Sequence, residues 1–250
     1  MKPERILDVL ATVAGEVRDA IDGIGTHDLR ARTDRPGQYE LDLVADEIAL
    51  ARLLGAGFAV VSEESGASGP ANAAITVVLD PVDGSTNCAR GIPYWAISMC
   101  ALDAEGPLAA LVVNQATGMR NEAIRGAGAT RDGRAIIPSA AERVEDSVVA
   151  LAGTPAQVLR WKQFRVLGCA SLALCDVAAG GIDGYVDAGR WHAPWDYLGG
   201  YLICREAGAT VADVDGLELV TTDVSDRRQL VAAATPALFD ALLPAARHAA

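Results

Sequence analysis

The sequence predicts an α/β protein whose two halves have different patterns. Two amphipathic segments, 4–25 and 41–54, carry apolar residues at helical spacing and end at glycines. Short alternating segments at 95–102, 108–114 and 119–124 follow, with turns of two to six residues between them, so we expect antiparallel pairing. Beyond about residue 147, strand and helix patterns alternate instead. The first half is therefore α+β, with two helices on an antiparallel sheet, and the second is α/β, with flanking helices.

The remaining segments are assigned in the same way. The polar stretch 26–38 predicts a loop or a mobile hairpin, and the apolar runs 58–61 and 74–79 predict strands. The Gly-Ala-Gly-Ala run at 126–129 resembles part of a dinucleotide fingerprint, but no helix pattern follows it, so we expect a hairpin turn. In the second half we expect strands at 147–151, 164–167, 184–187, 210–214 and 230–234, and helices at 155–162, 171–179, 195–207 and 236–247.

The boundary between the halves is soft. A charge-rich stretch with one proline occupies 137–146. We therefore divide the chain into 1–143 and 144–250 and expect the two parts to form one functional unit.

Composition narrows the classes of function. The chain has 250 residues, a formal net charge of −12 and a pI of about 4.6, which argues against a nucleic-acid partner. Lys2 and Lys162 are its only lysines, so an anionic substrate needs another positive centre, and metal ions can supply it. No apolar stretch approaches the roughly 20 residues of a membrane span, and no signal-peptide core is present. Five widely spaced cysteines predict reduced, buried thiols in a cytoplasmic protein.

The most informative segment is the octapeptide Asp-Pro-Val-Asp-Gly-Ser-Thr-Asn at 80–87, directly after the apolar run 74–79. We expect a turn to aim Asp80 and Asp83 at one spot, where two charges 4 Å apart repel by about 4 kcal/mol at an effective dielectric near 20. A divalent cation is the simplest compensation. Ser85 is expected to cap a short helix over 86–90, whose first N–H groups could bind an anion.

Other acidic residues become candidates for the same site once this segment is considered. Glu63 and Glu64 also follow a strand, so their side chains converge with Asp80 if the two strands are neighbours. Asp46 lies within the second amphipathic segment. Taken alone, the glutamate pair is typical of a solvated loop and Asp46 of a charged helix face.

Together these motifs resemble the inositol monophosphatase family of the lithium-sensitive, magnesium-dependent phosphatase superfamily. The resemblance is carried by Glu-Glu-Ser at 63–65, the octapeptide at 80–87 and Trp195-Asp196, over about residues 7–231. It implies a layered αβαβα sandwich and a homodimer.

The resemblance also implies roles for individual residues. Two or three Mg²⁺ ions would be held by Glu63, Asp80, the Val82 carbonyl, Asp83 and Asp196. Catalysis would use Glu63 together with Asp46 and the Ser85 hydroxyl, which would orient and activate the attacking water. Substrate would contact Asp83, Gly84, Ser85, Gly168, Cys169, Ala170, Asp187 and Asp196. Glu64 would lie behind the ligands, Arg35 would stand in for a loop lysine of the family, and His192 is an open case between a proton donor, a substrate contact and an exposed loop residue.

The predicted activity is hydrolysis of a small polyol or sugar phosphate, such as myo-inositol 1-phosphate, by a metal-activated water. Histidinol phosphate, fructose 1,6-bisphosphate and 3′-phosphoadenosine 5′-phosphate remain alternative substrates. A haloacid-dehalogenase-type phosphatase fits poorly, because its two acids are separated by one residue and Asp80 and Asp83 by two. A non-catalytic binding protein of the same fold is the alternative from another class. The segment 188–194 looks about two residues longer than in inositol-selective members, so substrate choice is the least determined property.

Overall fold

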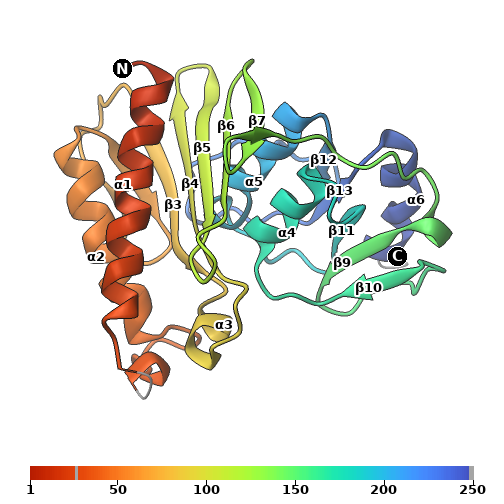
Figure 1. The fold of residues 1–250 in the computed structure, drawn as a ribbon, viewed down its shortest axis with the longest axis horizontal. Coiled ribbons are helices and arrows are strands. Elements are labelled where there is room, and N and C mark those ends of the chain that lie inside the picture. The colour runs from red at the N-terminus through yellow and green to blue at the C-terminus, as the bar shows by residue number, and fades with distance from the viewer. Residues whose placement is uncertain (26–27, 248–250) are drawn as a thin grey trace.

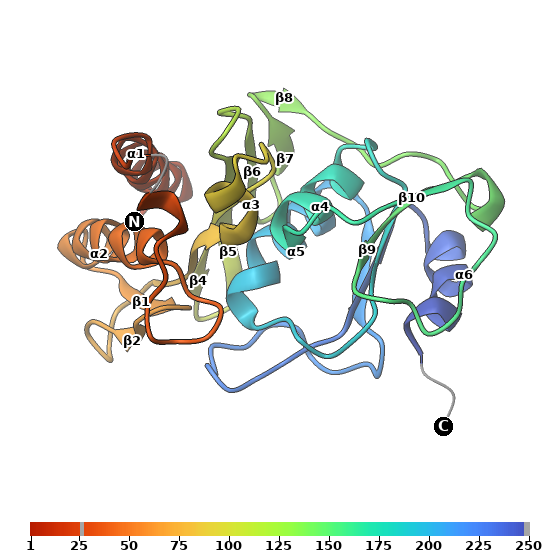
Figure 2. The ribbon, with the colours of Figure 1, turned by 90° about the horizontal axis from the view of Figure 1, so that it is seen from below.

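The computed structural model describes residues 1–25 and 28–247 and arranges them in five layers (Figure 1). Helices α1 (Pro3–Asp22) and α2 (Glu40–Gly55) cover the outer face of the first sheet. Helices α4 (Ala170–Ala178) and α5 (Pro194–Ala207) lie between the two sheets, and α6 (Pro236–Ala246) covers the far face of the second (Figure 2). The expected αβαβα sandwich is confirmed.

The first sheet has the strand order β2-β1-β3-β4-β5-β6-β7-β8. Its strands are β1 (Ala59–Ser62), β2 (Gly66–Ser68), β3 (Thr76–Asp83), β4 (Ala96–Asp103), β5 (Gly106–Asn114), β6 (Arg120–Ile124), β7 (Gly128–Arg131) and β8 (Arg134–Ala135). The neighbours pair antiparallel as expected, except that β1 and β3 run parallel. The parallel pair brings the C-terminal ends of both strands to one edge.

The second sheet is mixed and has the order β10-β9-β11-β13-β12. Its strands are β9 (Val148–Ala152), β10 (Gln163–Arg165), β11 (Gly184–Asp187), β12 (Thr210–Asp213) and β13 (Leu230–Ala233). The strands β10, β9 and β11 are parallel, and β13 pairs antiparallel with β11 and β12. All five agree with the sequence pattern to within two residues.

One predicted helix, at 155–162, is wrong. The segment has no regular structure and connects β9 to the parallel strand β10. The Ala156 N–H donates to the Ala245 carbonyl near the end of α6, and Leu159 and Trp161 pack against the core beneath that helix. One hydrogen bond and apolar packing against α6 therefore hold the segment in an irregular conformation.

The loop before α2 and the cysteines behave largely as expected. Thr26 and His27, at the start of the predicted loop 26–38, lie outside the described residues. The rest contains one 3-10 turn, Asp28–Arg30, and a bridge between Arg32 and Tyr39. All five cysteines are free and buried. Among the described residues, no helix is both long enough and apolar enough to cross a bilayer.

Candidate functional site

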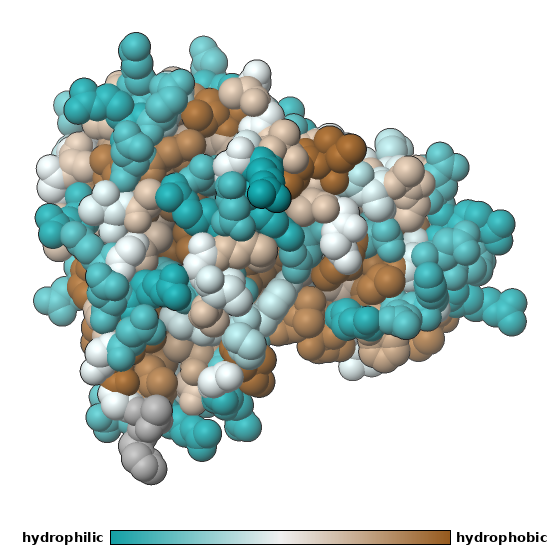
Figure 3. Space-filling view, in the orientation of Figure 1, coloured by the Kyte–Doolittle hydropathy of each residue, from teal (hydrophilic) through white to brown (hydrophobic). Residues whose placement is uncertain are grey.

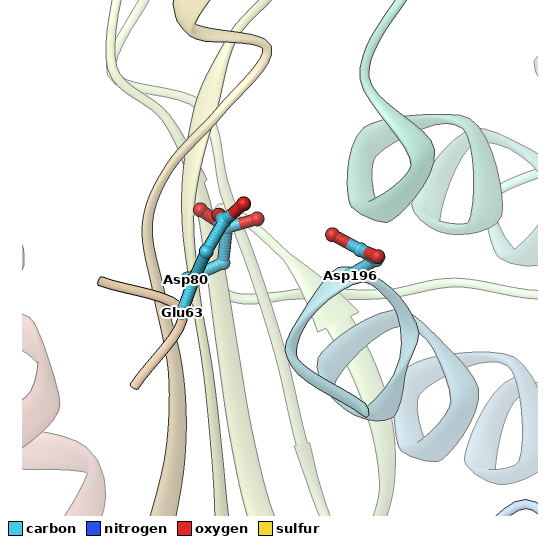
Figure 4. A group of neighbouring side chains, drawn as sticks. All are labelled: Glu63, Asp80 and Asp196. Atoms are coloured by element: carbon cyan, nitrogen blue, oxygen red, sulfur yellow. The ribbon is translucent and has the colours of Figure 1, made fainter. Parts of the chain in front are cut away.

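Three carboxylates from distant parts of the chain meet at one edge of the first sheet. Glu63, Asp80 and Asp196 each contribute one oxygen, and these three oxygens lie within 4.8 Å of one another. Figure 4 shows Glu63 and Asp80 side by side, with Asp196 facing them from the first turn of α5. The arrangement follows from the fold: Glu63 directly follows β1, Asp80 lies in the parallel neighbour β3, and α5 packs against the same sheet.

The octapeptide differs from the expected turn. β3 continues through Asp83, and its pairing with β4 shifts register between Asp80 and Asp83, where one strand has an extra residue. Such a bulge re-aims side chains at the end of a strand. This bulge, rather than the expected turn, allows Asp80 and Asp83 to face the same site.

The predicted cap by Ser85 is also wrong. Helix α3 (Ser85–Arg90) begins at Ser85, and the capping position belongs to Gly84 without a side-chain cap. Gly84 has φ +87°, and a Cβ there would lie 3.0 Å from the Gly168 carbonyl oxygen. The backbones at Gly84 and Gly168 lie so close that a side chain at position 84 would not fit. It also brings the octapeptide against the 168–170 segment of the second half.

Burial and mutual repulsion disfavour the charged form of these acids. Burial, then the charges of Asp196 and Glu64, raise the pKa of Glu63 to about 8. Burial and neighbouring Glu63 raise the pKa of Asp80 well above its usual range, and Asp80 is 1% exposed. A hard divalent cation binds oxygen ligands and removes this repulsion. The donor set therefore fits a cation of the magnesium type.

Asp83 joins the first sheet to the second half. Its Oδ2 accepts hydrogen bonds from the Ser171 N–H at 2.7 Å, the Ser171 hydroxyl at 2.6 Å and the Cys169 thiol at 3.1 Å. Burial and the charge of Asp196 raise the pKa of Asp83 despite these bonds. Ser171 was not singled out from the sequence, because nothing local marks a residue whose partner lies so far away.

Three further residues of the site come from α2 and β1. Asp46 is buried and accepts a hydrogen bond from the Ser62 hydroxyl, the residue before Glu63. Asp42 lies one helical turn before Asp46, and burial raises its pKa to about 7. Its Oδ1 has no hydrogen-bond partner among the described residues. The four-residue spacing to Asp46 was the signal that could have identified Asp42.

Glu64 and Arg35 bind each other beside the cluster. Arg35 Nη1 lies 3.2 Å from Glu64 Oε2, and Gln38 also donates to that oxygen. Glu64 therefore anchors the loop before α2.

A cavity of about 260 Å³ opens from the acidic cluster into the second half. Asp83, Asp196, Cys169, Trp191 and His192 are among its lining residues. Residues 168–170, the predicted substrate turn, also line it.

Asp187 lies behind the cavity wall rather than on it. Its side chain is 0% exposed, and burial raises its pKa to about 6. His192 separates it from the cluster, with Nε2 3.6 Å from Asp187 and Nδ1 3.5 Å from Asp196. Burial lowers the pKa of His192, but the hydrogen bond with Asp196 and both carboxylates outweigh burial, so the pKa is raised.

The family can now be assigned. Residues 12–249 match the model of the inositol monophosphatase family. The chain belongs to this family. The resemblance to this family is thereby confirmed.

Similar proteins carry related names. The fructose-1,6-bisphosphatase of Pyrococcus furiosus is 31% identical over 206 residues, or 81% of each chain. The fructose-1,6-bisphosphatase/inositol-1-monophosphatase of Archaeoglobus fulgidus is 33% identical over 241 residues, covering 91% of this chain and 92% of that one. Nus factor SuhB of Escherichia coli is 33% identical over 175 residues, 63% of each chain.

Solved structures agree on the fold. A Pyrococcus horikoshii protein described as similar to inositol-1 monophosphatase has a TM-score of 0.86 at 27% identity, with 98% of this chain and 99% of that chain covered. As a member of the inositol monophosphatase family, the present protein is a phosphoric monoester hydrolase acting on small sugar or polyol phosphates. The family is metal-dependent, and the acidic cluster fits that chemistry.

Proposed function

We propose that this protein hydrolyses a small sugar or polyol phosphate with Mg²⁺ bound at the acidic cluster. The carrying observation is that Glu63, Asp80 and Asp196 offer oxygens within 4.8 Å of one another beside a cavity. Oxygen ligands favour Mg²⁺ over zinc, which prefers nitrogen and sulfur. We assign the two or three ions to Glu63, Asp80, the Val82 carbonyl, Asp83 and Asp196. When bound, such ions neutralise the phosphate and stabilise the leaving oxygen.

The protein's own groups position the reactants. The hydrogen bond from Ser62 holds Asp46 Oδ1, and we assign the other oxygen, together with the Ser85 hydroxyl, to the attacking water. Asp46 accepts the proton of that water as a P–O bond forms. The bond to the leaving oxygen breaks, that oxygen takes up a proton from solvent, and Asp46 releases its proton to solvent, which gives an alcohol and inorganic phosphate. We assign the phosphate to the backbone at 84–85 and the leaving group to the 168–170 turn.

We also propose that the two halves, residues 1–143 and 144–250, form one functional unit. The first sheet ends at Ala135 and the second begins at Val148, so the boundary expected near 143 falls between them. Because the proposed ligands come from both sides of that boundary, neither half forms the site alone.

The decisive experiment is a phosphate-release assay on four substrates, with Mg²⁺ and with a chelator. The substrates are myo-inositol 1-phosphate, histidinol phosphate, fructose 1,6-bisphosphate and 3′-phosphoadenosine 5′-phosphate. We expect turnover of at least one, only with Mg²⁺, and inhibition by millimolar Li⁺. Equal rates in the chelator contradict the metal-dependent mechanism.

The homodimer stays a prediction from the resemblance, and the cytoplasmic location stays a prediction from the cysteines. Light scattering of the purified protein tests the first, and fractionation of cells tests the second.

A further inference from the structure

The cavity beside the acidic cluster is polar at one end and apolar beyond it. Asp83 and Asp196 form the polar end. Val166, Leu167 and Ala173 line the rest, together with residues 150–153 at the end of β9. Phe164 and Val166 are exposed apolar side chains in and beside β10, and Figure 3 shows brown surface interrupted by teal in the second half. With cations bound at the acids, a substrate would place its phosphate at the polar end and its remaining atoms against hydrocarbon.

Trp191 forms a fixed part of the apolar wall although it is 57% exposed. A Cβ on Gly153 would lie 2.5 Å from its ring, and a Cβ on Gly189 would lie 2.4 Å from it. Both positions lack side chains, so the ring rests directly on backbone. Trp191 therefore offers a supported, flat aromatic surface.

Few side chains remain to bind the hydroxyl groups of a substrate. Asp187, the expected hydroxyl contact, is fully buried and lies behind His192. Apart from the Trp191 indole N–H, the polar side chains that line the cavity beyond the acids already have partners: Tyr185 and His192 share a hydrogen bond of 2.6 Å, and Cys169 donates to Asp83. A hydroxyl group that loses water without gaining a partner weakens binding.

Given the phosphatase function proposed above, we propose that the cavity selects sugar phosphates that turn a flat apolar face toward Trp191. Such a face comes from a deoxygenated ring or from an aromatic base on the sugar. Stacking on tryptophan favours either one, and each unpaired hydroxyl of a polyol lowers affinity. Trp191 is then the residue that determines specificity, and fully hydroxylated inositol phosphates are the poorer substrates.

Two matched pairs of substrates test the proposal and separate the two sources of the apolar face. Cyclohexyl phosphate and myo-inositol 1-phosphate share a six-carbon ring and differ in hydroxyl groups. Adenosine 5′-monophosphate and ribose 5-phosphate share the ester position and differ in the aromatic base. The measurement is kcat/KM for all four with Mg²⁺ in wild type, Trp191→Ala, Trp191→Phe and Phe164→Ala. Phe164 is the control, because it is a 54% exposed aromatic residue outside the cavity lining.

We expect the apolar member to be preferred in at least one pair, and Trp191→Ala to reduce that preference about tenfold. Trp191→Phe keeps most of the preference, and Phe164→Ala leaves it within about twofold. Preference for the hydroxylated member in both pairs, or an unchanged preference in Trp191→Ala, overturns the inference while hydrolysis itself stands. If neither these four esters nor the four of the earlier assay are hydrolysed, the proposed function fails instead.

Discussion

The two ends of the cavity are built in contrasting ways. At the acidic end, Asp80 lies in a buried strand and Glu63 directly follows the parallel strand beside it. At the apolar end, Trp191 and His192 belong to the connection between β11 and α5, outside any strand or helix. Pairing of β1 with β3 positions two of the three acids at the first end, whereas the connection between β11 and α5 supplies the aromatic part of the second. Chemistry and substrate choice should therefore respond separately to mutation.

The largest effect is expected for Asp80→Asn, which disables the acidic end alone. Loss of this carboxylate should reduce kcat/KM by about 10³ or more, because cation binding and charge neutralisation are lost together. Removing a buried charge should leave the Tm in chelator unchanged or higher. Steady-state kinetics and thermal unfolding measure both. Near-normal turnover would rule out a metal role for Asp80.

Proton and cation should compete at the acidic end. The folded pKa of Glu63 is raised from 4.5 to about 8, so between these values the folded chain binds more protons than the unfolded one. Stability without cations is therefore full below about pH 4.5 and falls as the pH rises toward 8. Mg²⁺ should raise the Tm by at least about 3 °C at pH 8 and less at pH 6. An equal Mg²⁺ effect at both values contradicts this coupling.

Shortening the loop should affect the other end. Deleting Arg190 and Trp191 should change the ratio of kcat/KM between paired substrates about tenfold, since the stacking surface is lost. The Mg²⁺ concentration for half-maximal activity should change less than about threefold. Titrations of substrate and metal on the same variant separate the two quantities. A large shift in Mg²⁺ dependence would show that the two ends are not independent.

The smallest effect is expected where the two ends are joined. Asn87 Nδ2 donates to the Tyr94 carbonyl at 2.8 Å and to the Leu167 carbonyl at 2.7 Å, and so connects the first half to the second. Asn87→Ala should cost about 1–2 kcal/mol, or about 3–6 °C in Tm, because two partly buried acceptors lose their donor. Asn72→Ala, on an exposed loop, is the matched control and should shift the Tm by less than about 1 °C.

The contrast also explains which features the sequence could predict. The acidic octapeptide lies next to a continuous apolar run, so both the strand and the metal-binding role could be predicted from adjacent residues. The bulge between Asp80 and Asp83 was not, because it depends on pairing with β4. The helix prediction at 155–162 was wrong for the same reason, because the segment contacts α6, which is distant in sequence. The burial of Asp187 could not be predicted either, because His192 covers it only after the loop folds.

The position of Asp196 on α5 has a consequence for synthesis in the cell. Glu63 and Asp80 leave the ribosome long before the helix that completes their cluster. A nascent or prematurely terminated chain that lacks α5 has at most two of the three acids and nothing to close the cavity. On the proposed mechanism, hydrolysis requires α5, so a fragment that ends before this helix should be inert.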